Sequence, residues 1–272
     1  MSRIQAKFAE LKERGEAALI PFITAGDPDL KTTLKILRAL DEGGADCIEL
    51  GIPFSDPTAD GPTIQRSSER ALKNGLSLPQ IFRTVREFRQ DSELPLILFG
   101  YFNPIFHYGL EKFCSDASRA GADGILCVDL PPEESAEFKR WTDAEELDLI
   151  FLLSPTSGPD RVQLVARGSQ GGFIYYVSVT GVTGARRSFD DHLRSQVARI
   201  RRATSLPVGV GFGISTPRQA AWIAGFADAA VVGSALVEVI EKSKGNVEKA
   251  RRAGAFVAQL KTAIKRVAKE KP

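Results

Sequence analysis

Eight short apolar segments rich in β-forming residues recur along the 272-residue chain, and this repetition constrains the fold more than any other feature. The segments do not alternate polar and apolar residues, so they predict strands that are buried on both faces, as in a parallel sheet. The intervals between them are too long for hairpins. The predicted strands are 18–24, 46–50, 94–101, 123–128, 147–154, 172–179, 206–212 and 228–234.

Segments with apolar residues at helical spacing separate these strands. The predicted helices are 28–44, 78–90, 109–121, 131–145, 159–168, 189–204, 216–225 and 246–270. The N-terminal segment before the first strand predicts a further amphipathic helix rather than a signal peptide, because it lacks a continuous apolar core. Eight strand–helix units predict an α/β fold, a single-domain (β/α)8 TIM barrel over residues 1–272 with an extra N-terminal helix. An open doubly wound sheet is the alternative, although no G-x-G-x-x-G follows the first strand.

Charge and composition argue against several classes of function. The chain has 36 Lys and Arg residues against 34 Asp and Glu residues, and its net charge of +2 gives no electrostatic reason to expect binding to nucleic acid or to an anionic membrane. No stretch approaches the roughly 18 apolar residues of a membrane span. The odd number of cysteines, Cys47, Cys114 and Cys127, argues against a disulfide framework and favours a reducing compartment, so we expect a cytoplasmic protein.

The residue pattern predicts neither a metal site nor a covalent nucleophile. His107 and His192 have no histidine or cysteine neighbour at ligand spacing, so we expect no metal. The chain has no G-x-S-x-G elbow and no Cys–His pair that would indicate nucleophilic catalysis. No lysine falls inside a predicted strand, which argues against a Schiff base in the barrel.

Two carboxylates mark the second predicted strand and the loop after it. Glu49 lies inside the apolar segment, and Asp60 follows in a loop crowded with Gly and Pro. Active groups of a barrel come from the C-terminal strand ends and the following loops. A Glu49 side chain that faces the apolar interior would have a raised pKa and could give and take a proton near neutral pH, whereas Asp60 should stay ionised. Singly, Glu49 could form a structural ion pair or point outward, and Asp60 could serve the turn; together they favour catalysis.

Gly-rich turns follow the last three predicted strands. Their backbone N–H groups can converge on an anion, and the loops after strands 7 and 8 are the usual phosphate site of a TIM barrel. The predicted phosphate cradle comprises Gly213, Gly233 and Ser234, with Gly184 from the preceding loop. Apolar residues near strand ends could form a flat slot beside it, although most such residues are core: Phe22, Tyr101, Leu126, Tyr175 and Phe212.

Five motifs, in this order, resemble the tryptophan synthase α-subunit family. They are ALIPFITAGDPD, IELGIPFSDPTADGP, GYFNPI, YYVSVTGVTGAR and VGFGIS, and the resemblance spans about residues 3–265. It implies a TIM barrel and the retro-aldol cleavage of indole-3-glycerol phosphate to indole and D-glyceraldehyde 3-phosphate, without a metal or cofactor in this chain. It also implies a β subunit that carries pyridoxal phosphate, an α2β2 complex, and transfer of indole to that partner for tryptophan synthesis.

The resemblance also implies roles for individual residues. Glu49 matches the acid–base group that protonates the indole ring at C3 and helps deprotonate the glycerol hydroxyl. Asp60 matches the carboxylate that hydrogen-bonds the indole N–H, and Tyr175 matches a catalytic-site residue near Glu49. The phosphate set is Gly184, Gly213, Ile214, Gly233 and Ser234; the indole pocket and its lid comprise Phe22, Ile64, Tyr101, Leu126, Thr183, Phe212 and Val231; the partner interface includes Asp56, Pro57, Asn103 and Phe106, in the loops after the second and third strands.

A few positions differ from the usual family pattern. Thr58 replaces a Leu, Val128 replaces an Ala or Pro at the indole pocket, and Arg186 and Arg187 add positive charge to the closing loop. None of these changes removes a chemical group that the reaction needs. Three alternatives stay open: a stand-alone indole-releasing lyase, a non-catalytic regulatory subunit, and another phosphate-binding barrel such as a sugar-phosphate isomerase. Retention of both carboxylates argues against the second, and the PFSDPTADGP and GVTG loops argue against the third.

Overall fold

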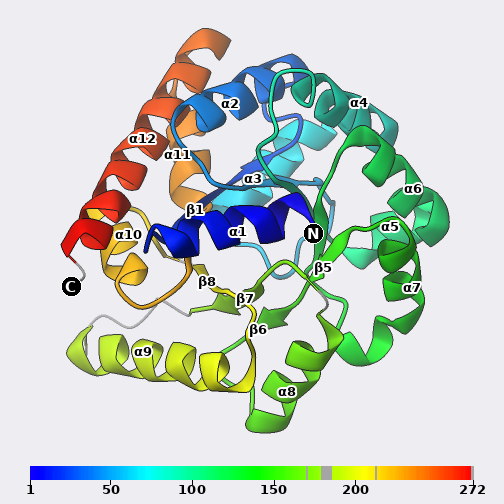
Figure 1. The fold of residues 1–272 in the computed structure, drawn as a ribbon. Helices are drawn as coiled ribbons and strands as arrows, with labels where there is room; N and C mark the ends of the chain where they lie inside the picture. The colour runs from blue at the N-terminus through cyan, green and yellow to red at the C-terminus, as the bar shows by residue number, and fades with distance from the viewer. Residues whose placement is uncertain (170, 179–185, 212, 271–272) are drawn as a thin grey trace.

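The computed structural model describes residues 1–169, 171–178, 186–211 and 213–270, and within them a ring of parallel strands is surrounded by helices (Figure 1). The strands are β1 (Ala18–Thr24), β2 (Ile48–Gly51), β3 (Leu96–Gly100), β4 (Gly124–Cys127), β5 (Asp148–Ile150), β6 (Leu152–Leu153), β7 (Ile174–Val177), β8 (Val208–Gly211) and β9 (Ala229–Val232). The helices are α1 (Arg3–Glu13), α2 (Leu30–Glu42), α3 (Pro62–Leu72), α4 (Leu78–Phe88), α5 (Phe102–Tyr108), α6 (Leu110–Ala120), α7 (Ala136–Ala144), α8 (Pro159–Gly168), α9 (Arg186–Ala203), α10 (Pro217–Ala224), α11 (Ser234–Lys242) and α12 (Asn246–Glu270), with a 3-10 turn, η1 (Pro132–Glu134), before α7.

The order of the strands describes a nearly closed barrel. Among the described residues the order is β5-β4-β3-β2-β1-β9-β8-β7-β6, and the paired strands are parallel. The two ends of this order, β5 and β6, are halves of the predicted strand 147–154, divided at Phe151. The Phe151 carbonyl still accepts a hydrogen bond from the Tyr175 amide at 3.1 Å. The predicted TIM barrel is therefore confirmed, and the open doubly wound sheet is wrong.

Three helices lie where the sequence pattern predicts none. α3 buries only the small side chains of Ser67, Ser68 and Ala71, so it lacks the apolar spacing that reveals a helix. α5 spans seven residues, which is too short to display a helical period, and it buries Ile105 alone. α11 does bury apolar residues at helical spacing, although the helices predicted from the sequence do not include it. Two of these three helices, α3 and α11, begin at the candidate site described below.

The apolar side chains form an inner core inside the barrel and an outer core between the strands and the helices. Neighbouring residues on a strand point to opposite faces of the sheet, so each strand contributes to both. The inner core includes Ile20, Cys47, Ile97, Leu126, Ile150, Phe173, Tyr175 and Val231. The predicted N-terminal helix is present as α1, and Figure 1 shows it lying across one end of the barrel. Its residues Ile4, Phe8 and Leu11 join the inner core and close that end.

A buried ion pair fastens the C-terminal helix α12 to the barrel. Lys261 Nζ lies 2.9 and 2.7 Å from the two carboxylate oxygens of Asp46, the residue two before β2. One of those oxygens also accepts a hydrogen bond from the Leu19 amide at 2.7 Å. Both charged side chains are buried. In the described part of the chain, no helix is long and apolar enough to cross a membrane.

Replacing Lys261 by Met is expected to lower the free energy of unfolding by about 3 kcal/mol, because it leaves the Asp46 carboxylate buried without its cation. Urea unfolding followed by circular dichroism measures the change. Lys265→Met is the matched control, since Lys265 is exposed one turn further along α12. Equal stabilities of the two variants would contradict this account of the ion pair.

Candidate active site

Glu49 points into the barrel. Its neighbours Ile48 and Leu50 belong to the outer core, whereas Cys47, two residues earlier, belongs to the inner core. Alternation along the strand therefore directs Glu49 inward. The residue is 1% exposed, and on the adjacent strands it is in register with Phe22 and Ile97. The expectation that Glu49 faces the apolar interior is confirmed.

The Glu49 carboxyl is buried, and one of its oxygens lacks a hydrogen bond from the described residues. Its Oε1 atom has no hydrogen-bond partner among the described residues. Burial alone raises the pKa of this carboxyl to about 8, because the charged form loses its hydration. No ion pair to Glu49 forms within the described ranges, so the alternative of a structural salt bridge receives no support there. At neutral pH this group is mainly a neutral acid, able to donate a proton and then to take one back.

Asp60 lies in the loop between β2 and α3, and its side chain is partly buried. Burial raises the pKa of its carboxyl to about 6, and a hydrogen bond from the Tyr101 hydroxyl opposes that rise. The same hydroxyl accepts a hydrogen bond from the Ala59 amide at 3.0 Å, while Gln65 Nε2 donates to the Asp60 carbonyl at 2.9 Å. Asp60 stays largely ionised above pH 7, as the sequence predicts, but it titrates closer to neutrality than an open loop would allow.

Tyr175 on β7 stands near both carboxyls. Burial raises its pKa well above the usual range, and the charges of Glu49 and Asp60 raise it further, so the phenol stays protonated. The Tyr175 hydroxyl passes so close to Gly211 that a methyl group there would lie only 2.1 Å away. Gly211 on β8 therefore leaves the space that the ring occupies.

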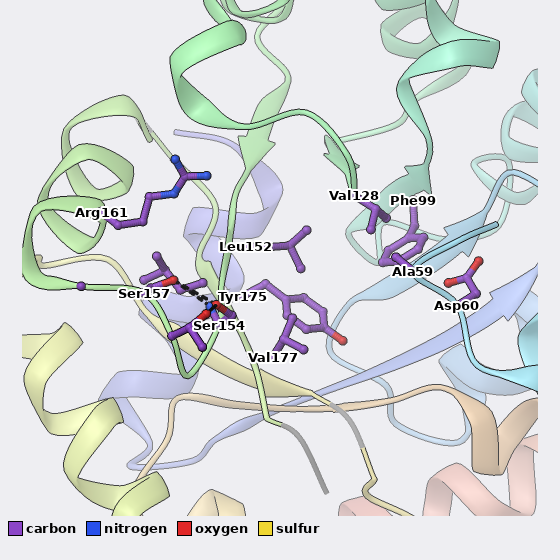
Figure 2. Close-up of a pocket in the computed structure, with 13 residues that line it drawn as sticks. Ala59, Asp60, Phe99, Val128, Leu152, Ser154, Ser157, Arg161, Tyr175 and Val177 are labelled. Carbon is purple, nitrogen blue, oxygen red and sulfur yellow. Dashed lines mark hydrogen bonds between the residues drawn. The ribbon is translucent and has the colours of Figure 1, made fainter. Parts of the chain in front are cut away.

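A cavity of about 520 Å³ opens at the C-terminal ends of the strands. Its apolar lining includes Phe99, Val128, Leu152 and Val177. Figure 2 shows Phe99 and Val128 near Asp60, and the ring of Tyr175 beside Val177 with its hydroxyl on the side of Asp60. At the other end lie Ser154, Ser157 and Arg161, as Figure 2 shows. The volume falls within the range of small-molecule sites, and its mostly apolar lining suits a flat aromatic group.

Four predicted indole-pocket residues, Phe22, Ile64, Leu126 and Val231, pack near the cavity or in the inner core. Phe22 packs edge-on against Phe99, with ring centroids 5.1 Å apart. Ile64, in the first turn of α3, and Phe22 both border Gly233, where an added methyl group would lie 3.7–3.8 Å from them. Leu126 and Val231 belong to the inner core. These four residues do not themselves line the cavity described above.

The predicted phosphate residues lie at two chain turns. Gly213 follows β8 and has φ +75°, a conformation that favours glycine. Gly233 caps α11, and Ser234 is its first residue. The Ile214 side chain packs in the outer core rather than facing the cavity, so any anion contact there would use its backbone. Thr183, Gly184 and Phe212 lie outside the described residues.

The predicted interface residues lie on the same end of the barrel. Asp56 is exposed and Pro57 half-buried in the loop after β2, and Asn103 and Phe106 are exposed. Asn103 and Phe106 lie on helix α5 rather than in a loop, which corrects the sequence prediction. The Phe106 side chain is 58% exposed, unusual for a large apolar group.

Several cavity residues carry no motif of their own and are absent from the residues predicted from the sequence. Phe99, Leu152 and Val177 each follow, at a spacing of two, an inner-core residue of the same chain segment. That alternation would have identified them once the inward register of each strand was known. Ser154, Ser157 and Arg161 come from the loop after β6 and the start of α8, where only tertiary structure shows that they reach the cavity.

Within the described ranges, no group of three or more His, Cys, Asp or Glu side chains is arranged to hold a metal ion. The arrangement instead joins a neutral buried carboxyl, a second carboxyl that is largely ionised above pH 7, and a protonated phenol beside an apolar cavity. Such a set can protonate an aromatic carbon and stabilise the positive charge that results.

Comparisons with known proteins agree with this geometry. A family model described as tryptophan synthase alpha chain matches residues 8–265. The tryptophan synthase alpha chain of Geobacter sp. (strain M21) is 58% identical over 264 residues, which cover 97% of this chain and 98% of that protein. That of Geotalea uraniireducens is 58% identical over 268 residues, covering 98% and 99%. The crystal structure of tryptophan synthase subunit alpha from Legionella pneumophila has a TM-score of 0.88 at 39% identity and covers 98% of this chain and 99% of that one.

Proposed function

We propose, because this chain belongs to the tryptophan synthase alpha-chain family, that Glu49 and Asp60 carry out the lyase reaction of that family here. The chain cleaves indole-3-glycerol phosphate to indole and D-glyceraldehyde 3-phosphate in tryptophan biosynthesis. The observation that carries the assignment is Glu49, a carboxyl buried in an apolar barrel, unpaired at Oε1, with a pKa of about 8. A non-catalytic regulator is not favoured, since such a chain has no use for this costly group.

The reaction begins with proton transfer from Glu49. The neutral carboxyl gives its proton to C3 of the indole ring, which becomes an indolenine with positive charge on nitrogen. Asp60, as a carboxylate, accepts a hydrogen bond from the ring N–H and stabilises that charge. The Glu49 carboxylate then removes the proton of the glycerol hydroxyl next to the scissile bond. The C–C bond breaks, its electron pair returns to the ring, and an aldehyde forms, so Glu49 regains the proton that it gave.

The indole ring and the phosphate of the substrate are proposed to bind at different parts of the site. The indole ring is proposed to lie against the apolar lining, near Tyr175 and with its N–H toward Asp60. The phosphate is proposed to bind the backbone N–H groups near Gly213 and at the start of α11, where Gly233 and Ser234 present a helix N-terminus. Gly184 and the lid residue Thr183 complete the proposed site from the segment outside the described residues.

The alpha-chain name of the relatives implies a β partner, and solved structures similar to this chain include tryptophan synthase from Mycobacterium tuberculosis at 33% identity and a TM-score of 0.87. We propose an α2β2 complex in the cytoplasm, in which the β subunit carries pyridoxal phosphate and receives the indole. We propose that residues 1–272 form one domain and that the face with Asp56, Pro57, Asn103 and Phe106 contacts this partner.

Phe106→Asp is expected to weaken binding to a tryptophan synthase β subunit at least about tenfold, because it places a charge where an apolar side chain would be buried. Isothermal titration calorimetry measures the affinity. Val247→Asp is the control, since Val247 is 72% exposed on α12, which Figure 1 shows across the barrel from α5. An unchanged affinity for Phe106→Asp would move the interface elsewhere.

The pH dependence of kcat/KM for indole formation is expected to be bell-shaped. Activity needs protonated Glu49, so it falls as pH rises through about 8. It also needs ionised Asp60, so it falls as pH drops through about 6. Initial rates between pH 5 and pH 9.5 at low substrate measure both limbs. A rate that keeps rising above pH 9 would contradict the role of Glu49 as the acid.

The products test the assigned reaction directly. Purified chain with indole-3-glycerol phosphate and a chelator, but no added cofactor, is expected to release indole and triose phosphate in equal amounts. A coupled dehydrogenase assay measures the triose phosphate, and chromatography measures the indole. Triose phosphate without indole, or neither product, would contradict the assignment.

A further inference from the structure

One arginine outside the cavity joins three elements that reach the active site. Arg70 lies on α3, and its Nε and Nη2 donate to the two carboxylate oxygens of Asp27, each at 2.8 Å. Its Nη1 donates to Glu241 Oε1 at 2.7 Å. Asp27 follows β1, and Glu241 lies in the last turn of α11. Arg70 therefore connects the end of β1, helix α3 and helix α11, which also pack against one another.

Three hydrogen bonds from the Arg70 guanidinium hold Asp27 and Glu241 in place relative to α3. Asp27 is 6% exposed, and Arg70 takes both of its oxygens in a bidentate pair, the stronger form of this interaction. Glu241 also accepts hydrogen bonds from Arg66, the shorter at 2.8 Å. Hydrogen bonds and charge from Arg66 and Arg70 lower the pKa of Glu241 to about 2, so the Glu241 carboxyl is ionised at neutral pH. A network of this kind holds its members more firmly than an isolated surface pair does.

The other ends of the two helices are at the active site. Gly61 caps α3 directly after Asp60, and Gln65 in the first turn holds the Asp60 carbonyl at 2.9 Å. Helix α11 begins at Ser234, after Gly233, which borders Ile64 of α3. A shift of α3 therefore moves Asp60, and a shift of α11 moves the proposed phosphate turn.

We propose that Arg70 is a positioning residue for the lyase reaction, holding Asp60 and the Gly233–Ser234 turn at a fixed separation through α3 and α11. The inference rests on the proposed roles of Asp60 and Ser234. Arg70 does not line the cavity and does not act on Asp60 by charge, because the pKa of Asp60 is set by burial and Tyr101. The effect is geometric, and misplacement of a reacting group by about 1 Å can cost on the order of 100-fold in rate.

The test compares Arg70→Met, Arg70→Lys and the control Arg66→Met in the full chain. Arg66 is one turn away on α3 and contacts Glu241 but not Asp27. Arg70→Met is expected to lower kcat for indole release at least about tenfold. Arg70→Lys keeps the charge but cannot make the bidentate pair and the Glu241 bond together, so it is expected to recover only part of the rate. Arg66→Met is expected to stay within about twofold of wild type.

A double-mutant cycle separates positioning from general support of the fold. If Arg70 acts through Asp60, Arg70→Met should cost much less in an Asp60→Asn background than in the wild type. Should Arg70→Met fail to fold, Glu241→Gln takes its place in the cycle, since Glu241 is the partly exposed end of the link. Losses that simply multiply in the double variant would overturn the inference, as would a folded Arg70→Met with near-normal kcat.

Hydrogen exchange provides a readout that needs no activity. In Arg70→Met the amides of 61, 63–65 and 234–237 are expected to exchange faster, while those of α4 stay unchanged. Unchanged exchange at both helix starts would overturn the inference even if the wild-type chain released indole. Faster exchange in a chain whose wild type releases no indole would retain the mechanical link and reject the proposed function.

Discussion

Glu49→Gln is expected to lower kcat for indole formation by about 10⁴-fold, the upper end of general acid–base effects, while indole-3-glycerol phosphate still binds. Glutamine has almost the same shape as glutamic acid, but its amide can neither protonate C3 nor take up the hydroxyl proton. Nothing in the described structure stands ready to replace it, since Tyr175 is held protonated by burial and by the two nearby carboxyls. Calorimetric titration measures binding, and a long-incubation indole assay measures the residual rate.

Stability provides the control for this variant. The pKa of Glu49 in the folded chain, about 8, is above its ordinary value of 4.5, so the folded state binds more protons between these values. The contribution of Glu49 protonation to the free energy of unfolding is therefore fully present below pH 4.5 and is lost as pH rises through 8. Glutamine has no proton to lose, so Glu49→Gln should match wild type near pH 4.5 and exceed it at pH 9 by on the order of 4 kcal/mol. Near-normal turnover would show that another group is the acid, and lower stability at pH 9 would contradict the buried, unpaired carboxyl.

Asp60→Asn is expected to lower kcat by about 100- to 1000-fold, with a much smaller change in substrate affinity. The asparagine side chain would still fit the loop, but a neutral amide cannot stabilise the positive charge that develops on the ring nitrogen. The acid limb of the pH profile, near pH 6, should disappear with the carboxylate. Steady-state kinetics from pH 5 to 9.5 measure kcat, KM and both limbs together.

The control for Asp60→Asn is Glu69→Gln, which removes a negative charge from the exposed face of the helix that follows. It is expected to change kcat by less than about twofold, because exposed charges are strongly screened. If Asp60→Asn changed only KM, Asp60 would be a binding residue. If the acid limb persisted in that variant, another group would be responsible for it.

The barrel could be predicted from the sequence because its signal is local. Strands buried on both faces read as continuous apolar segments, and each strand is followed by a helix pattern. Glu49 could be identified because a carboxylate is costly to bury in an apolar strand, which suggests that it has a function. Its raised pKa then followed from burial alone, without knowledge of any partner.

What the sequence could not supply depends on contacts between distant residues. The pKa of Asp60 is moved by burial beneath a loop and by Tyr101, which follows a different strand. Helix α3 escaped prediction because it packs through small side chains. The link through Arg70 joins Asp27 and Glu241, which are more than 200 residues apart in the chain, and no local pattern indicates that they meet.

The central claim is that this chain is a catalytic alpha chain that works with a β partner. The most direct measurement is indole release from purified indole-3-glycerol phosphate, by the chain alone and with a tryptophan synthase β subunit added. The account predicts slow release by the chain alone and a many-fold rise with the partner. Fast release without any partner effect would contradict the partnership and indicate a stand-alone lyase, and no release in either case would contradict the catalytic assignment itself.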